Sequence, residues 1–371
     1  MKRLLFIATS YHQGERIYPA LDTLCGEFEV DIMTVGRGSD KFPWYGDVDL
    51  RPKLWSRAKR LGIRLVHGPN NAGTEEGYVK EIHQNFKDNE YHAVILDDSM
   101  VYKNNYLRAA VAWAKKRSLP VFACPHGAAW WLGRKDHKNI KALNAGVDWL
   151  FVFGKEEQDN VSDALKPRTI RGGIPANDIL AGMRETEPKH ILVFAGWQPS
   201  SPYVRGMMRI GDPYKDYSVL SGKVLARCGI NELSRRLGLP ILIKQKSRKN
   251  QAAEDAGLWD GIDEYSILND VLDDNKLLAE AAVALGSPTT MSLKSMTLGR
   301  PTILLRRYGI EGHLEAFDGM VNVKDDILLT EYDRQIADHE GRIEWAERFA
   351  TGSKNGTASE NYLKGIEGKL R

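Results

Sequence analysis

The sequence predicts a two-domain α/β protein built on parallel sheets, and three observations indicate it. Short apolar segments rich in β-branched residues alternate with segments of helical period along the chain, which is typical of βα units. The length of 371 residues exceeds what one hydrophobic core usually spans. The alternation also begins again after a polar stretch at 181–189 that has no apolar period. We therefore expect two domains of similar size, 1–185 and 186–345, followed by a C-terminal segment at 346–371.

Apolar runs and helical periods place the individual elements. In the first half, strands are expected at 4–8, 29–34, 93–96, 121–124 and 149–153, with helices at 17–24, 75–86 and 106–116. In the second half, strands are expected at 191–194, 239–243, 282–285 and 302–305. Farther on, 328–350 is charged and has a helical period, and a Gly-, Ser-, Thr- and Asn-rich stretch at 351–359 precedes a last helix. Each half therefore contains enough strands for a sheet of its own.

The composition argues against several functional classes. No apolar run approaches the roughly 20 residues that a membrane-spanning helix needs, and the N-terminus is expected to be a strand rather than a signal peptide. The three cysteines lie far apart without metal-ligand spacing, which predicts a reducing, cytoplasmic location and no metal site. Dinucleotide, P-loop, α/β-hydrolase and zincin motifs are missing, which argues against NAD chemistry and those enzyme classes. A net charge of +3 does not by itself imply a nucleic-acid partner.

Polar residues follow the predicted strands of the first half, where open α/β sheets bind ligands. His12 follows the first strand, and its position fits a general base as well as a solvated loop histidine. Asp97 and Asp98 follow the strand at 93–96. One of these acids can cap the helix expected after them, but two adjacent acids exceed what one cap requires. Asp98 and His12 are therefore the candidate catalytic residues.

A glycine follows two further strands at the point where a ligand is expected. His126 and Gly127 come directly after the strand at 121–124. The glycine lets the backbone approach a ligand, and the histidine can donate to a phosphate or sugar oxygen, although a buried turn histidine is the alternative. Gly196 and Trp197 occupy the same position after the first strand of the second half. We expect all four residues to contact a bound donor molecule.

Cations and hydroxyls at two strand ends of the second half predict an anion site. The candidates are Lys244, Lys246, Ser287, Thr289, Thr290 and Lys294. Hydroxyls and free backbone N–H groups at a helix start bind anions, and lysines from a neighbouring strand end would complete a clamp for a diphosphate. The alternative is a solvated lysine face beside an ordinary helix cap.

Three stretches of the chain resemble the GT-B superfamily, mostly within 93–178 and 239–308. The segment 121–127 resembles the strand ending in His-Gly of its transferase members, and 171–178 resembles a Gly-Asn-Pro-x-x-Asp turn before the interdomain crossing. The segment 286–301 resembles the donor-phosphate loop and helix. The branch indicated contains the non-hydrolysing UDP-N-acetylglucosamine 2-epimerases, the CDP-glycerol glycerophosphotransferases and the capsule-type glycosyltransferases.

The resemblance implies two Rossmann-like parallel-sheet domains that face each other across a cleft, with a C-terminal helix that crosses back to the first domain. It implies that the second domain holds the nucleotide and diphosphate of a donor such as a UDP-sugar. The first domain would present the acceptor and any base. No metal and no cofactor besides the nucleotide-sugar co-substrate are implied.

The chain departs from its relatives at positions that carry their chemistry. Where relatives often place an acid that binds the ribose, this sequence has Leu293 and Lys294. The His-Arg-x-Glu-Asn motif of the epimerases is replaced at 195–199, and their acid before Ala-Gly in the first domain is replaced at 125–127. Asp98 does fall where the epimerases place a catalytic acid.

Sugar transfer from a nucleotide donor to a hydroxyl acceptor is the leading hypothesis, and four alternatives stand beside it. A nucleotide-sugar 2-epimerase, a CDP-glycerol-type polyol phosphotransferase and a non-catalytic binder share the implied fold. A DNA-modifying (hydroxymethylpyrimidine) glycosyltransferase would use basic and aromatic residues at 53–64, 130–131 and 205–209. The modest net charge argues against this nucleic-acid acceptor. The sequence leaves the oligomeric state open.

Overall fold

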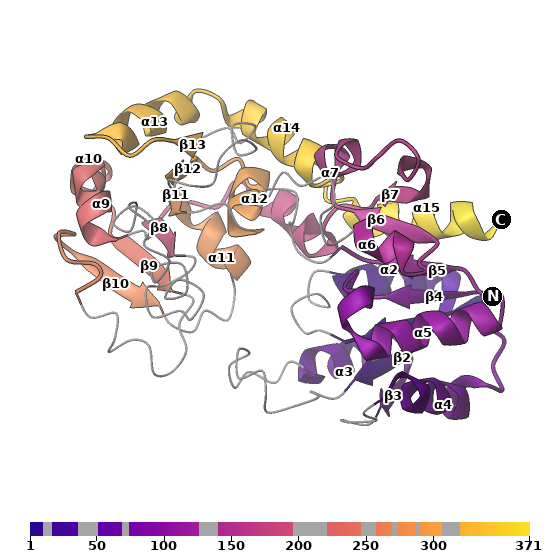
Figure 1. Ribbon diagram of the computed structural model, residues 1–371. Coiled ribbons are helices and arrows are strands. Elements are labelled where there is room, and N and C mark those ends of the chain that lie inside the picture. Colours follow the sequence, from indigo (N-terminus) through magenta and orange to yellow (C-terminus); the bar gives the residue numbers. More distant parts are fainter. Residues whose placement is uncertain are drawn as a thin grey trace, which may run out of the picture. The chain divides into compact units, whose positions relative to one another are not determined.

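The protein forms two compact units, each with its own sheet (Figure 1). The computed structural model describes residues 1–9, 17–35, 51–68, 74–125, 140–195, 221–245, 257–268, 274–286, 290–305 and 320–371. Unit 1 comprises Met1–Ile179 and Glu347–Arg371, and unit 2 comprises Leu180–Ala346. The chain therefore passes from unit 1 to unit 2 and returns.

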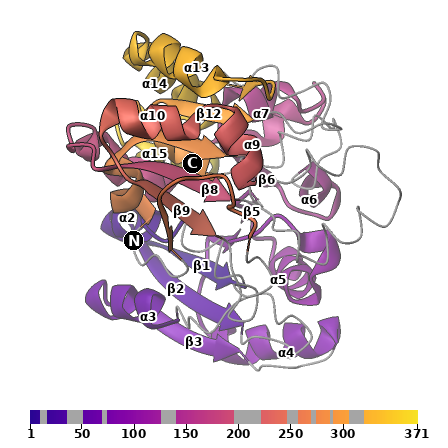
Figure 2. The same cartoon turned by 90° about the vertical axis from the view of Figure 1, so that its left-hand side faces the viewer.

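Unit 1 contains a seven-stranded parallel sheet. Its strands are β1 (Lys2–Ala8), β2 (Phe28–Val35), β3 (Arg64–Gly68), β4 (Ala93–Leu96), β5 (Val121–Ala123), β6 (Trp149–Val152) and β7 (Thr169–Arg171). Their order is β3-β2-β1-β4-β5-β6-β7. Figure 2 shows β1, β2 and β3 as neighbouring arrows that point the same way.

Helices cover both faces of this sheet. They are α2 (Ala20–Glu27), α3 (Arg51–Arg60), α4 (Glu75–Phe86), α5 (Asn105–Lys116), α6 (Ile140–Asn144), α7 (Lys155–Asp159) and α15 (Ala358–Leu370), with short 3-10 segments η1 (Val101–Lys103) and η3 (Lys166–Arg168). Two further elements, η4 (Pro175–Met183) and α14 (His339–Phe349), run across the division between the units.

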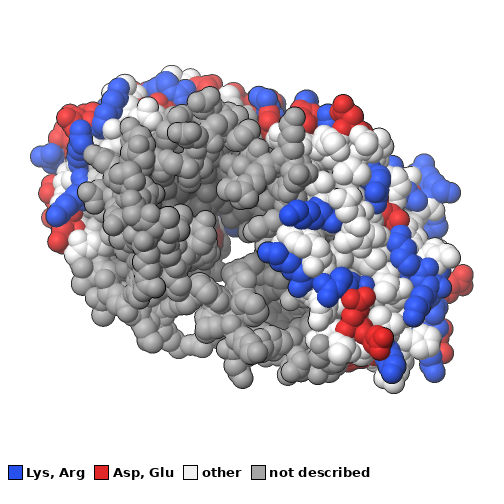
Figure 3. Space-filling view, in the orientation of Figure 1, with Lys and Arg blue, Asp and Glu red and all other residues white. Residues whose placement is uncertain are grey.

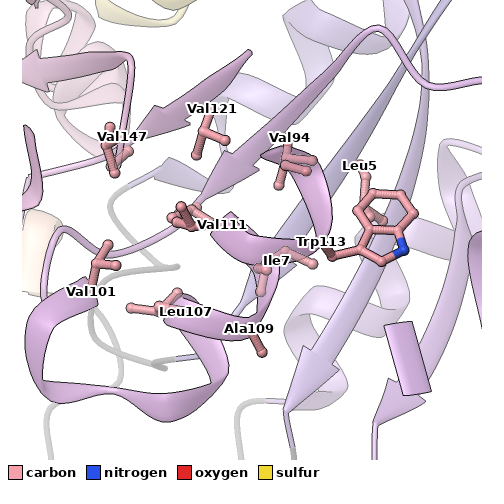
Figure 4. Close-up of a cluster of buried hydrophobic side chains, with 14 of the residues drawn as sticks. Leu5, Ile7, Val94, Val101, Leu107, Ala109, Val111, Trp113, Val121 and Val147 are labelled. Carbon is pink, nitrogen blue, oxygen red and sulfur yellow. The ribbon is translucent and has the colours of Figure 1, made fainter. Parts of the chain in front are cut away.

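Alternate residues of β1 enter two different cores, which explains why the strand is apolar throughout. Leu5 and Ile7 pack with α4 and α5, where Val111 and Trp113 are buried (Figure 4). Leu4, Phe6 and Ala8 pack instead with α2 and with Tyr362 and Ile366 of α15. A strand covered on both faces needs apolar residues at every position, as in other parallel sheets.

The C-terminal helix α15 is fixed to unit 1 by Asp178. The Asp178 carboxylate accepts hydrogen bonds from the backbone N–H groups of Ala358 and Ser359, both at 2.8 Å, and from the Ser359 hydroxyl at 2.6 Å. Farther along α15, the Tyr362 ring stacks on Phe151 of β6 with centroids 4.1 Å apart. An acid distant in the sequence therefore caps this helix, because it satisfies N–H groups that a helix start leaves unpaired.

Unit 2 contains a six-stranded parallel sheet. Its strands are β8 (His190–Ala195), β9 (Ile241–Gln245), β10 (Tyr265–Leu268), β11 (Ala281–Gly286), β12 (Thr302–Leu305) and β13 (Met320–Val321), in the order β10-β9-β8-β11-β12-β13. Its helices are α9 (Gly222–Arg227), α10 (Ile230–Leu237), α11 (Asp274–Ala279), α12 (Thr290–Thr297) and α13 (Ile327–Ile336). The buried strand residues Ile191, Val193, Ile243 and Val283 pack with α9, α10 and α13 on one face.

Both sheets have the strand order of the Rossmann fold. Numbered within each unit, the order is 3-2-1-4-5-6, and unit 1 adds a seventh strand at the end. The order reverses between β1 and β4 in unit 1 and between β8 and β11 in unit 2. We call each of these two places the switch point of its unit. The predicted pair of parallel-sheet α/β domains is confirmed.

Several predicted elements have different bounds, and four strands were not predicted. The helix expected at 17–24 begins at Ala20, directly after Pro19. The strand expected at 239–243 is Ile241–Gln245, because Pro240 has no N–H for the sheet ladder. The strands β3, β7, β10 and β13 are short or polar and lack the apolar run that marked the others. None of the described helices combines the length and apolarity that a membrane span requires.

Candidate functional site

Asp97 joins the ends of β1 and β4 at the switch point of unit 1. Thr9 follows β1 and Asp97 follows β4, and these strands are neighbours. The Thr9 backbone N–H donates to Asp97 Oδ2 at 2.7 Å, and its hydroxyl donates to Oδ1 at 2.8 Å. The Asp97 side chain is fully buried. Asp97 therefore fastens the two strand ends between which ligands of this fold bind.

Asp98 lies at the same switch point, and only 5% of it is exposed. Its Oδ1 accepts a hydrogen bond from the backbone N–H of Met100 at 2.8 Å. The expectation that one of the two acids caps the following helix is wrong. The 3-10 segment η1 intervenes, and Asn104 caps α5 by accepting from the N–H groups of Tyr106 at 2.9 Å and Leu107 at 3.3 Å.

Tyr102 of η1 lies near Asp98 and near two lysines. Burial raises the pKa of Tyr102, and the charge of Asp98 raises it further. The Lys103 and Lys141 ammonium groups lie 5.7 and 5.6 Å from the centroid of the Tyr102 ring. None of Tyr102, Lys103 and Lys141 was predicted from the sequence. Their only sequence signal was that Tyr102 and Lys103 lie four and five residues after Asp98.

Cys124 lies near Asp97 and Asp98 and is not a nucleophile. It follows β5 and is completely buried. Burial raises the pKa of its thiol well above the ordinary value, and the charge of Asp97 adds to the effect. Because the thiolate is the reactive form, a buried thiol of this kind is inert.

In unit 2, two lysines meet at the first turn of α11. Lys244, at the end of β9, forms an ion pair with Asp274, and their side chains are 22% and 34% exposed. Lys294 of α12 donates to Asn275 Oδ1 at 2.9 Å. Both lysines were predicted from the sequence as site residues, whereas Asp274 and Asn275 were not. An acid and an amide at a helix start were the available signal.

The N-terminus of α12 follows β11 at the switch point of unit 2. The backbones of β11 and β8 lie close together there, because a Cβ on Gly286 would lie 2.5 Å from the Phe194 carbonyl oxygen of β8. The helix starts at Thr290. A helix N-terminus carries about half a unit of positive charge and free N–H groups, which makes it an anion site. A helix start therefore lies at the end of the predicted donor-phosphate segment, and its phosphate role stays a prediction.

Most other predicted site residues lie outside the described residues. These are His12, His126, Gly127, Gly196, Trp197, Lys246, Ser287 and Thr289, together with the side chain of Thr290. Their roles remain predictions. Among the described residues, no group of three or more His, Cys, Asp or Glu side chains is arranged to hold a metal ion.

Comparison with known proteins identifies the fold. No protein-family model matches the sequence, and no curated protein sequence matches it. Among solved structures, a UDP-GlcNAc 2-epimerase from Neisseria meningitidis bound to UDP-GlcNAc is similar, with 13% identity, a TM-score of 0.66 and coverage of 99% of this chain and 100% of that chain. The UDP-GlcNAc 2-epimerase of Methanocaldococcus jannaschii has 11% identity, a TM-score of 0.62 and coverage of 98% and 99%.

A third similar structure is that of MurG from Acinetobacter baumannii, with 12% identity, a TM-score of 0.51 and coverage of 99% of this chain and 100% of that chain. Similarity at such low identity establishes the fold alone. The protein has the GT-B fold, as its sequence resemblance implied.

Proposed function

We propose that the protein is an enzyme acting on a nucleotide sugar, and that it transfers the sugar from a nucleotide-diphosphate donor, such as a UDP-sugar, to a hydroxyl acceptor. The observation that carries the proposal is the contrast between the two switch points. Unit 1 has a buried carboxylate, Asp98, at its switch point. Unit 2 has a helix N-terminus there, and Lys244 and Lys294 meet at the neighbouring α11. The first arrangement suits a base and the second suits a diphosphate.

In this scheme, unit 2 binds the donor. The N-terminus of α12 and the predicted hydroxyls of Ser287, Thr289 and Thr290 hold the diphosphate. Lys244 and Lys294 add positive charge, and Asp274 keeps Lys244 in place through their ion pair. These groups stabilise the leaving diphosphate without a metal ion, because preorganised cations and N–H donors offset the charge that develops on it.

Asp98 then activates the acceptor. The acceptor hydroxyl gives its proton to the Asp98 carboxylate, and the hydroxyl oxygen bonds to the anomeric carbon of the donor sugar. The bond between that carbon and the phosphate oxygen breaks, and the nucleoside diphosphate leaves with its electron pair. His12 is the alternative base. One well-placed base contributes about 10²–10⁴-fold to the rate.

A nucleotide-sugar 2-epimerase is the second candidate. Two of the three similar structures described above are UDP-GlcNAc 2-epimerases, and Asp98 falls where that family places a catalytic acid. The replaced motifs at 125–127 and 195–199 favour transfer. Incubation with UDP-GlcNAc alone, followed by proton NMR, separates the two, because only an epimerase forms the C2 epimer without an acceptor.

A donor screen tests the proposal itself. Thermal shifts are measured with UDP, GDP, CDP and dTDP and with their sugars. A ligand at about 100 times its Kd stabilises the protein by about 2.7 kcal/mol, which is readily detected. We expect one nucleotide to stabilise the protein well above the others. Equal, negligible shifts with the whole panel would refute a nucleotide-sugar enzyme.

A further inference from the structure

We infer that unit 1 also contains an anion subsite, in which Lys103 and Lys141 beside the ring of Tyr102 bind a phosphate or carboxylate group of the acceptor. The inference deepens the proposed function and rests on it, since it takes the ligand to be the acceptor. The acceptor class is a hydroxyl-bearing molecule with an anionic group, such as a sugar phosphate or a uronic acid.

The subsite is built from two elements. Lys103 Nζ lies 5.7 Å from the centroid of the Tyr102 ring, and Lys141 Nζ lies 5.6 Å from it. Tyr102 and Lys103 belong to η1, whereas Lys141 belongs to α6, and the two elements are in contact. Residues far apart in the sequence thus bring two ammonium groups to one aromatic ring.

The position of Tyr102 is fixed by its neighbours. Its carbonyl oxygen accepts a hydrogen bond from Arg108 Nη1 at 3.2 Å, and its hydroxyl donates to Met100 Sδ at 3.3 Å. The adjacent Val101 is fully buried in the core of unit 1 (Figure 4). The ring is therefore a preorganised platform, and less ordering free energy is lost when a ligand binds.

The two ammonium groups have no acidic partner among the residues that the structure describes. Other lysines of this unit do: Lys115 pairs with Asp148, and Lys155 pairs with Asp159. Figure 3 shows Lys and Arg side chains gathered over α5 and α6. The face of the Tyr102 ring attracts each ammonium group. Two positive charges held at one ring attract an anion more strongly than either charge alone.

The neighbouring carboxylate explains why an anionic acceptor would need this subsite. Asp98 lies close enough to Tyr102 that its charge raises the tyrosine pKa, after the larger effect of burial. By itself, the carboxylate would repel an anionic molecule. Lys103 and Lys141 can hold the anionic end of the acceptor while its hydroxyl reaches Asp98. The two lysines thus select the acceptor, and Asp98 activates it.

Calorimetric titration of the full chain with glucose 6-phosphate, glucuronate and glucose tests the inference, with UDP saturating so that the donor site is occupied. We expect at least one anionic sugar to bind about 10-fold or more tightly than glucose. The preference of the protein for the anionic sugar over glucose should become smaller between 50 and 300 mM NaCl, because salt screens exposed charges. The two anionic sugars distinguish a phosphate from a carboxylate site.

Matched variants locate the site. Lys103→Gln and Lys141→Gln should each reduce the preference for the anionic sugar about 2- to 10-fold. Lys116→Gln is the control, because Lys116 is an exposed lysine of the same unit, in the last turn of α5. Equal binding of all three sugars, or an equal loss in the control, overturns the inference. Failure of UDP, GDP, CDP and dTDP alike to bind any form of the protein would instead refute the donor proposal.

Discussion

The two units share one strand order but differ in the charge of their strand ends. At the switch point of unit 1, the buried acid Asp97 joins two strands, and Asp98 stands beside it. In unit 2, the lysines of β9 and α12 are positioned by the first turn of α11. The difference teaches that the strand order supplies only the location of a site. The side chains after each strand decide its chemistry.

Replacing Asp98 should have the largest effect, because it removes the proposed base of unit 1 and lowers turnover. Asp98→Asn removes the proposed base while keeping the size of the side chain and its oxygen acceptor for the Met100 N–H. We expect turnover to fall about 10²–10⁴-fold with donor affinity nearly unchanged. Asp88→Asn, at an exposed acid of the same unit, is the control and should be silent. Initial rates and donor titrations provide the two readouts.

The same measurements on His12→Ala decide between the two candidate bases. If this variant loses turnover and Asp98→Asn does not, the base is His12. Unchanged turnover in both variants would show that neither residue is the base.

Replacing Lys244 of β9 should weaken the proposed diphosphate site of unit 2. Lys244→Ala deletes a cation and leaves Asp274 unpaired, so both changes oppose a bound diphosphate. We expect the affinity for the nucleoside diphosphate to fall about 10- to 150-fold, as for a charged hydrogen bond. Lys189→Ala is matched to it, since Lys189 also pairs with an acid but precedes β8, at the opposite sheet edge. Equal affinities in both variants would contradict the proposed diphosphate position.

Asp97 and Lys244 should also differ in their contribution to stability. Asp97→Ala leaves the Thr9 N–H and hydroxyl without their buried acceptor, which should lower the free energy of unfolding by about 1–3 kcal/mol or more. The partly exposed Lys244 pair should contribute about 1 kcal/mol or less. Urea denaturation of both variants checks the order. A larger loss for Lys244→Ala would reverse the assignment of structural and binding roles.

The smallest expected effect is a pH dependence in unit 2. Burial lowers the pKa of His190, whose Nε2 lies 3.0 Å from the Leu277 carbonyl oxygen. As the pH falls below about 6.5, the ordinary pKa of histidine, His190 is therefore protonated in the unfolded chain before it is protonated in the folded protein. Stability is retained above that pH and declines as pH falls toward the folded pKa. Denaturation between pH 7.5 and 5.5 should show a weaker decline in His190→Gln than in the exposed-site control His83→Gln. Identical declines would exclude His190 as the source.

The sequence allowed the central strands to be predicted, but not the strands at the edges of the two sheets or the order of the strands. The strands at 93–96 and 302–305 were placed correctly because both faces are buried and every residue except Thr302 is apolar. The edge strand β10 contains mostly exposed residues, so no apolar run announced it. Strand order depends on contacts between distant segments, which periodicity does not record.

The same limit applies to the site. Asp98 and Lys244 could be proposed because they directly follow apolar strands. The role of Asp97 depends on Thr9, 88 residues earlier, and that of Lys244 depends on Asp274, 30 residues later. Local patterns therefore allowed candidate residues to be proposed, but not the partners that position them.

The capping of α15 by Asp178 has a consequence for how the protein is made on the ribosome. Unit 1 cannot complete its fold until Glu347–Arg371 emerges, because that segment supplies α15 and the Tyr362 ring that stacks on Phe151. All of unit 2, residues Leu180–Ala346, is translated in the meantime. At synthesis rates of about 5–20 residues per second, this interval lasts about 10–30 s. During that time one apolar face of the first sheet lacks the cover that α15 provides, so apolar surface of the nascent chain is exposed to chaperones and to aggregation.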